Sequence, residues 1–454
     1  MARVDEPVTP VQDAAPAPLD QPESSAAAAA ADLVVPPSLV AQSLGDYLRA
    51  LGARVRGGDS GILPVVVGMV LIAVVFEAIS PNHVFLSANN LVNLFQQSAV
   101  FMVLAMAECF VLLLGEIDLS TGFAGPLAGV IAVQLVQPTT TNWPWWAAII
   151  AALLALALVG AVNGTIITRM RMPSFIVTLG MFLVLNGVVL IVLSFGPFSG
   201  TPTLIGDSPN TKFISDLMYG NVDPTVSWIG MVVIVALLAL SLWLRDSRRR
   251  RSGLVAPPRA LTIIKIVFIA IVGVVVVAIC SINRARFGTI AGVPYVIPIV
   301  LGVFAVWMVL LERMPFGRYL YAIGGNPEAA RRAGINLARV RTIAFILCSV
   351  TAGIGGLLYV SYLGGASNNI NGGQLTLYAV AAAVIGGTSL FGGRGRVMHG
   401  LLGGLVIGGI YNGMFLLGLA VQWELIVTGL VLLVAVAIDS LSRRSATGGS
   451  AARV

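Results

Sequence analysis

Long apolar runs alternate with short polar breaks along most of the chain, from residue 62 to residue 441. A helix needs about 20 apolar residues to cross a hydrocarbon core of about 30 Å, and most of the runs approach that length. The pattern therefore predicts an all-α bundle of about twelve transmembrane helices. The third and tenth runs are short and rich in Gly, Thr and Ser. The predicted spans are residues 62–80, 94–114, 120–137, 145–168, 174–195, 228–244, 261–281, 294–312, 342–363, 375–391, 398–419 and 423–441.

The two ends of the chain depart from this pattern. Residues 1–37 are acidic and rich in Pro and Ala, which predicts a disordered cytoplasmic tail, and residues 443–454 form a second polar tail. Within residues 38–57, apolar positions recur at helical spacing, with arginines on or near the opposite face. This fits an interfacial amphipathic helix and equally a solvated linker. The predicted membrane domain comprises residues 58–442.

Composition and charge add an orientation. Hydrophobic residues make up 57% of the chain and charged residues 10%, with a mean hydropathy of +0.93, outside the range of soluble domains. With the N-terminus placed in the cytoplasm, all but three of the 27 Lys and Arg residues fall in inner segments. Because basic residues concentrate on the cytoplasmic side, both termini are expected there. The net charge of +7 then faces the anionic inner leaflet, so no nucleic-acid partner is expected.

Motifs for catalysis are missing from the sequence. The only lysines are Lys212 and Lys265, and neither completes the phosphate-binding loop G-x-x-x-x-G-K-[ST] of ATPases. No H-E-x-x-H motif occurs, and the three cysteines have neither disulfide nor metal-site spacing. We therefore expect a chain that is not an enzyme and that holds no cofactor or metal of its own.

The inner loop at residues 313–341 contains a short, charged helix in an otherwise apolar chain. In "AIGGNPEAARRAGIN", two glycines are expected to break the chain, Asn326 to cap a helix, Pro327 to begin it and Gly334 to end it in a left-handed conformation. A helix of about two turns is too short to span a membrane and too polar to enter lipid. A surface helix that closes a tight loop would also explain it. The residues concerned are Gly325, Asn326, Pro327, Glu328, Ala329, Ala330, Arg331, Arg332 and Gly334.

The order "EAA", three residues, then glycine resembles the EAA loop of ABC-importer permeases, whose coupling helix docks in a cleft of the ATPase subunit. "GEIDLSTG" (115–122), "NGTIITRMRMPSFIVTLGM" (163–181), "GRYLYAIGGNPEAARRAGIN" (317–336) and "AVIGGTSLFGGRGR" (383–396) extend the resemblance to permeases of ribose, xylose and galactose importers. The resemblance implies a homodimer in the bacterial inner membrane. It also implies an ATPase partner with two fused nucleotide-binding domains that binds ATP and Mg, and an extracytoplasmic sugar-binding protein.

One difference from the ribose-type permeases indicates a particular branch of the family. Residues 205–292 insert two spans around the basic loop "RDSRRRRSGLVAPPR", which is similar to the longer, xylose-type branch and implies a pentose substrate. Permeases for branched-chain amino acids or nucleosides share the superfamily and remain an alternative. A twelve-span ion- or proton-coupled carrier is a second alternative. It predicts two related six-span halves, and no such repeat is visible in the sequence. A receptor or channel would not explain the inner loop.

Polar residues inside the predicted spans need a reason, because a charge near the bilayer centre costs a few kcal/mol. Glu108 is a gate candidate, or else a partner for a polar group of a neighbouring helix. Asp118 or Ser120 is expected to cap the third span, which suits a discontinuous helix that lines a cavity. Hydroxyl and amide groups suit the passage of a neutral sugar. Further pathway candidates are Asn163, Thr178, Asn186, Asn412 and Gln422.

Small residues recur every fourth position along the eleventh span, at Gly400, Gly404 and Gly408. Such a row lets two helix backbones approach closely. The sequence leaves open whether the partner helix belongs to the same subunit or to a second one.

Overall fold

The structure is a computed structural model that describes residues 45, 49, 62–194, 202–204, 208–253, 256–285, 288–367 and 369–451. The predicted tail at 1–37 lies outside these residues, and so does nearly all of the predicted helix at 38–57. In the described part, the chain is helical, with two isolated β-bridges, Thr203 to Gly365 and Asn221 to Pro294. The predicted all-α class is confirmed.

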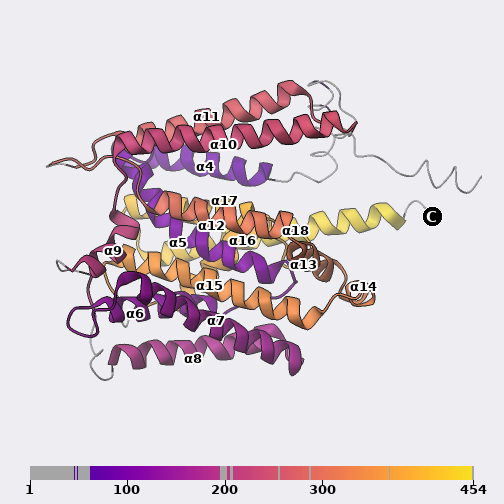
Figure 1. The fold of residues 1–454 in the computed structure, drawn as a ribbon, viewed down its shortest axis with the longest axis horizontal. Coiled ribbons are helices and arrows are strands. Elements are labelled where there is room, and N and C mark those ends of the chain that lie inside the picture. The colour runs from indigo at the N-terminus through magenta and orange to yellow at the C-terminus, as the bar shows by residue number, and fades with distance from the viewer. Residues whose placement is uncertain are drawn as a thin grey trace, which may run out of the picture.

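Long helices lie side by side, roughly parallel or antiparallel (Figure 1). We call the two ends of this bundle the α9 end and the α14 end, after the short helices found there. The α-helices are α4 (Leu63–Ile79), α5 (Ala88–Leu112), α6 (Thr121–Val136), α7 (Trp145–Arg169), α8 (Ser174–Ser194), α9 (Pro209–Tyr219), α10 (Pro224–Arg251), α11 (Arg259–Ser281), α12 (Val296–Arg313), α13 (Pro315–Gly325), α14 (Pro327–Arg332), α15 (Leu337–Leu363), α16 (Gly372–Ile385), α17 (Val397–Leu416) and α18 (Val421–Ala451), with a 3-10 turn at Pro81–His83.

Eight described helices are long and apolar enough to cross a membrane: α5, α7, α8, α10, α11, α12, α15 and α17. Four shorter apolar helices occupy the remaining predicted positions, namely α4, α6, α16 and the stretch Val421–Val434 of α18. Every predicted range thus overlaps one helix. The two ranges with the weakest pattern correspond to α6 and α16, which have only 16 and 14 residues.

Two local expectations were wrong, and two short helices were missed. The helices α9 and α13, of 11 residues each, were not predicted, because short amphipathic helices do not produce a long apolar run. Gly324 and Gly325 do not break the chain but form the last turn of α13. The tenth span ends at Ile385 rather than at residue 391, and Gly387 follows with a φ of 110° that favours glycine.

The helix α5 forms the centre of the bundle. All its residues from Gln97 to Leu112 are buried, and α6, α12, α15, α16 and α17 pack around it. A helix that is apolar on all sides is stable only when other helices cover it, which explains why α5 lies inside. Its buried polar side chains Gln97 and Glu108 therefore meet protein groups rather than lipid.

The glycine row of α17 packs against α5 of the same subunit. A Cβ added at Gly404 would lie 2.4 Å from the Met102 Cα, and one at Gly400 would lie 2.7 Å from the Met106 backbone nitrogen. Real Cβ contacts are never this short, so only glycine allows the two backbones to approach this closely. The row therefore makes a contact within one chain.

We expect Gly404→Ala to destabilise the protein by about 1–3 kcal/mol, because the new methyl group meets backbone that cannot move aside. The matched control is Gly409→Ala on the same helix, where the added Cβ meets only Ile72 Cγ2 at 3.5 Å. The thermal midpoint of both purified variants in detergent is the measurement. Equal midpoints would contradict the packing described here.

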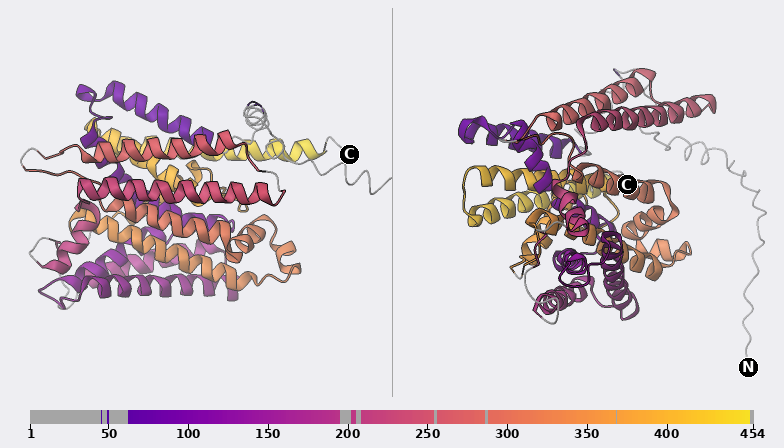
Figure 2. Two further views of the ribbon diagram at one scale, coloured as in Figure 1. Left: turned by 45° about the horizontal axis from the view of Figure 1, so that its top comes forward. Right: turned by 60° about the vertical axis from the view of Figure 1, so that its left-hand side comes forward.

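The hairpin of α10 and α11 lies at the edge of the bundle, in a layer with α4 (Figure 2). Most of its side chains are exposed, and α11 is the helix of the pair that packs against α5. The two helices are joined near their basic ends by a buried hydrogen bond of 2.7 Å from the Thr262 hydroxyl to Asp246 Oδ2. This hairpin occupies the two predicted spans on either side of the basic loop.

Candidate functional site

The charged loop at the α14 end adopts the capped helix expected from its sequence. The Asn326 side chain accepts a hydrogen bond of 3.0 Å from the Ala329 N–H, and Pro327 occupies the first position of α14. At the other end, Gly334 has a φ of 81°, and the Ile335 N–H bonds the Ala330 carbonyl oxygen. Such caps satisfy the terminal backbone groups that so short a helix leaves free.

Only one side chain of α14 is buried, that of Ala330. Glu328 and Arg331 form an ion pair of 3.3 Å, although both side chains are about two-thirds exposed, at 68% and 65%. An exposed pair of this kind adds less than about 1 kcal/mol to stability. The helix thus presents a small charged surface beyond the bundle (Figure 1).

Directly behind α14, the helix α13 presses against the segment that joins α5 to α6. A Cβ added at Gly324 would lie 1.8 Å from the Leu113 carbonyl oxygen and 2.6 Å from the Gly393 backbone nitrogen. The Gly393 N–H bonds the same Leu113 oxygen at 2.9 Å, and the Tyr321 hydroxyl donates to the Gly395 carbonyl oxygen at 2.8 Å. Three segments that are distant in sequence therefore meet backbone to backbone.

The segment between α5 and α6 also contacts the start of α15. Glu116 Oε1 lies 3.1 Å from Arg341 Nε. Burial raises the pKa of the Glu116 carboxyl, and the neighbouring Arg341 guanidinium partly opposes that shift. The ion pair links the segment to the helix that follows α14 in the chain.

Beyond Glu116, the segment enters a fully buried polar network. Asp118 Oδ1 accepts hydrogen bonds from the Ser120 N–H at 2.9 Å and the Ser120 hydroxyl at 2.5 Å, and Asn163 of α7 donates to Ser120 Oγ at 3.1 Å. The Thr121 hydroxyl lies 2.7 Å from Glu108 Oε1 and 3.0 Å from the Asp118 carbonyl oxygen. All five side chains are 0% exposed.

The hydrogen count at Thr121 bears on the state of Glu108. The Thr121 hydroxyl carries a single hydrogen, which an ionised Glu108 would have to share with the Asp118 carbonyl oxygen. Both contacts can be full hydrogen bonds when Glu108 carries a proton and donates it to Thr121 Oγ1, which is the state that we expect. Three oxygens of the network have no partner among the described residues: Glu108 Oε2, Asp118 Oδ2 and Asn163 Oδ1.

The structure brings four of the candidate pathway residues together and separates three. Glu108, Asp118, Ser120 and Asn163 share the buried network. Thr178 of α8 lies beside it, with its hydroxyl 3.3 Å from the Ile117 carbonyl oxygen. The expected cap of α6 is not formed as predicted, since Ser120 holds the N-cap position but its side chain bonds Asp118 instead of the helix backbone.

The remaining candidates lie elsewhere. Asn412 of α17 exchanges hydrogen bonds with the Asn90 amide and donates to Gln97 Oε1 at 3.0 Å, toward the α9 end. Asn186 is half-buried on α8. Gln422 is exposed in the first turn of α18. They share no network with Glu108.

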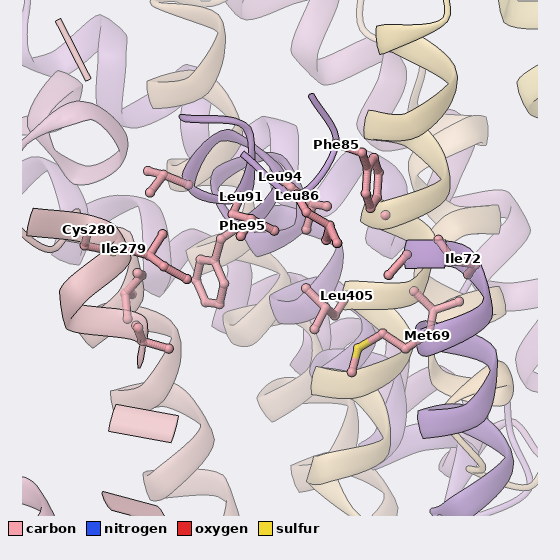
Figure 3. A pocket seen from close by; sticks show the side chains of 16 residues that line it. Met69, Ile72, Phe85, Leu86, Leu91, Leu94, Phe95, Ile279, Cys280 and Leu405 are labelled. Carbon is pink, nitrogen blue, oxygen red and sulfur yellow. The ribbon is translucent and has the colours of Figure 1, made fainter. Parts of the chain in front are cut away.

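A cavity of about 260 Å³ lies between α4, α5, α11 and α17. Apolar side chains such as Met69, Phe95, Ile279 and Leu405 point into it from these helices (Figure 3). A sugar needs hydrogen-bonding partners for its hydroxyl groups, and no side chain that lines this cavity offers a strong one. The cavity therefore does not qualify as a sugar site.

Sequence reasoning missed a polar group at the α9 end. Glu424, in the first turn of α18, is 8% exposed and accepts a hydrogen bond from the Tyr378 hydroxyl of α16. Gln374 donates to the same hydroxyl at 2.7 Å. The signal available in the sequence was the single acid at the start of an apolar run, but its partners are about 50 residues away.

Comparison with known proteins gives the class of this chain. Residues 90–436 match the family model described as branched-chain amino acid transport system / permease component. The chain belongs to this family of permease components. Within it, the chain is 33% identical to the xylose transport system permease protein XylH of Escherichia coli (strain K12) over 402 residues, which cover 87% of this chain and 97% of that protein.

Other relatives are similarly complete. The chain is 35% identical to XylH of Haemophilus influenzae over 84% of its length and 97% of that protein. It is 31% identical to the ribose import permease protein RbsC of Escherichia coli (strain K12) over 82% of its length and 91% of that protein. No solved structure matches. The resemblance to sugar permeases is confirmed, and the chain is a transport subunit, not an enzyme, in the bacterial inner membrane.

Proposed function

We propose that this chain is the membrane subunit of an ATP-binding-cassette importer that moves a monosaccharide, a pentose such as xylose, into the cytoplasm. The observation that carries the proposal is the near full-length similarity to xylose permeases, joined to an exposed, capped α14 where a coupling helix is expected. The chain itself needs no cofactor. ATP and Mg are bound by the partner ATPase.

All twelve apolar helices cross the membrane in this proposal, with both termini in the cytoplasm. Support comes from the distribution of charge, because the arginines that end α10 and those of α14 lie at the same end of the bundle (Figure 1). Basic residues favour the cytoplasmic side, which makes the α14 end the inner one. The α9 end then faces the outside.

Three partners complete the transporter. A second copy of this chain forms a homodimer, an ATPase with two nucleotide-binding domains docks on α14, and an extracytoplasmic sugar-binding protein delivers substrate at the α9 end. Closure of the ATPase would move α14 and hence α13. Because Gly324 is in backbone contact with Leu113, that motion passes to the segment between α5 and α6.

This route ends at the buried network, which we assign to the inner gate. Glu108, Asp118, Ser120 and Asn163 link α5, α6 and α7, and Thr178 adds α8. A network whose members satisfy one another holds one arrangement of helices, and a shift of the segment at 113–120 exchanges those partners. Asn186 and Asn412 lie farther along the pathway, away from this gate.

The coupling assignment is tested by the interaction with the ATPase. We expect Glu328→Trp, and likewise Gly334→Val, to prevent co-purification of the ATPase and to reduce sugar uptake at least about ten-fold. The first change blocks an exposed docking surface, and the second forces a β-branched residue to the left-handed φ that ends α14. Gly302→Val, on the exposed side of α12 where an added Cβ meets nothing within 4 Å, is the control. Normal assembly and uptake of both α14 variants would overturn the assignment.

A second candidate is import of a branched-chain amino acid, since the matching family carries that description. Competition for uptake separates the two, with unlabelled xylose expected to block labelled xylose and leucine expected to have no effect. An ion-coupled carrier would instead transport without the ATPase.

A further inference from the structure

Aromatic and hydrogen-bonding side chains from five helices gather toward the α9 end of the bundle. We call them the tyrosine cluster. It consists of Gln97 and Phe101 of α5, Tyr359 and Tyr362 of α15, Gln374 and Tyr378 of α16, Tyr411 of α17 and Glu424 of α18.

Three polar members of the cluster form one connected set. The Tyr378 hydroxyl donates to Glu424 Oε1, and the Gln374 amide donates to the Tyr378 hydroxyl at 2.7 Å and to Glu424 Oε1 at 3.3 Å. The set therefore joins α16 to α18, two helices that are brought together only in the folded chain.

Aromatic rings fill the space between these polar groups. Phe101 meets Tyr378 edge to face, with ring centroids 5.4 Å apart, and meets Tyr411 in the same manner at 5.9 Å. Gln97 accepts a hydrogen bond of 3.0 Å from the Asn412 amide. The pathway candidate Asn412 is thus joined to the cluster.

The position of the cluster distinguishes it from an interfacial belt of tyrosines. Gln97 lies nine residues into α5, about 14 Å from the start of that helix at 1.5 Å per residue, so the cluster extends well below the bundle end. An interfacial belt of tyrosines would lie at the membrane surface and face lipid. Tyr359, Tyr362, Tyr411 and Gln374 are only half-buried, and polar groups on spanning helices seldom face hydrocarbon. We therefore infer that this face borders water or another protein surface.

We propose that the tyrosine cluster is a transient binding site for a neutral monosaccharide on its way through the permease. This inference rests on the proposed import of a sugar. The half-buried rings of Tyr362 and Tyr411 suit the apolar C–H side of a pyranose or furanose ring, and the half-buried Gln374 amide suits its hydroxyl groups. Tyr378 and Glu424, which are buried behind it, hold that amide in position. No cationic side chain belongs to the cluster, so anionic sugars such as sugar phosphates would be disfavoured by Glu424.

The test separates sugar passage from coupling. Cells or proteoliposomes that contain the full transporter are assayed for labelled xylose uptake at saturating sugar and, in parallel, for ATP hydrolysis stimulated by the binding protein. Glu424→Gln and Tyr378→Phe keep the volume of each side chain but change its hydrogen bonding. We expect uptake to fall about ten-fold, which corresponds to roughly the loss of one hydrogen bond to a charged group. Stimulated ATP hydrolysis should stay within two-fold of the wild type. The control is Tyr295→Phe, an exposed tyrosine at the same end of the bundle.

Two outcomes would overturn the proposal that the tyrosine cluster contacts the sugar. Unchanged uptake in both variants would show that the cluster does not contact the sugar, and a parallel fall of uptake and ATP hydrolysis would assign it a structural role. Failure of the wild-type transporter to move any monosaccharide would instead reject the proposed function. The experiment thus distinguishes failure of the sugar-contact proposal from failure of the proposed function.

Discussion

Replacing Gly324 by alanine is expected to abolish sugar uptake. The added Cβ would lie 1.8 Å from the Leu113 carbonyl oxygen and 2.6 Å from the Gly393 nitrogen, both backbone atoms that cannot rotate away. Relief requires α13 to move off the segment between α5 and α6, at a cost of about 1–3 kcal/mol or more. Uptake of labelled sugar and co-purified ATPase are the measurements, and we expect ATP hydrolysis to become independent of sugar.

The neighbouring glycine supplies a matched control. Gly325 was expected in the coupling segment, but it lies in the last turn of α13, before α14 begins, and an added Cβ there meets nothing within 4 Å. Gly325→Ala should therefore leave uptake within two-fold of the wild type. The two variants have the same composition and differ by one position. Equal activity in both would show that the contact between α13 and Leu113 does not transmit motion.

The second large effect is expected at Glu108. Glu108→Ala removes a fully buried side chain from the central helix and leaves the Thr121 hydroxyl without one of its partners. The cavity and the lost hydrogen bond together destabilise the protein by about 2–5 kcal/mol. Glu108→Gln should be nearly neutral, because its amide donates to Thr121 as a protonated carboxyl does.

Thermal unfolding in detergent, followed by intrinsic fluorescence, measures both variants together with the wild type. A Glu108→Gln variant as unstable as Glu108→Ala would mean that Glu108 is ionised and accepts from Thr121. An infrared carbonyl band of a carboxylic acid that disappears in Glu108→Gln is an independent check.

The sequence predicted best those features whose causes are local. The cap at Asn326, the proline that follows it and the left-handed Gly334 form α14 almost without help from the rest of the chain, so they could be identified from fifteen residues. The positions of the long helices followed from the lengths of their apolar runs. The short helices α9 and α13 have no such run, and neither was found.

Features that join distant segments could not be predicted. Glu108 meets Thr121 because α5 and α6 turn back on each other, and Asn163 reaches the same place from α7. Nothing in one sequence pairs Glu424 with Tyr378, or assigns the glycine row of α17 to α5 instead of to a second copy. Polar residues inside spans could be recognised as unusual, but their partners depend on the packing of the bundle.

The hairpin of α10 and α11 has a consequence for how this protein can vary. Its outward faces carry exposed apolar side chains from Val226 to Val275, and its internal hydrogen bond from Thr262 to Asp246 is independent of the central helix. A unit that is closed on itself and attached along one edge can be lengthened, shortened or exchanged without repacking the core. We therefore expect that this hairpin can change in length while the central bundle of the chain stays the same.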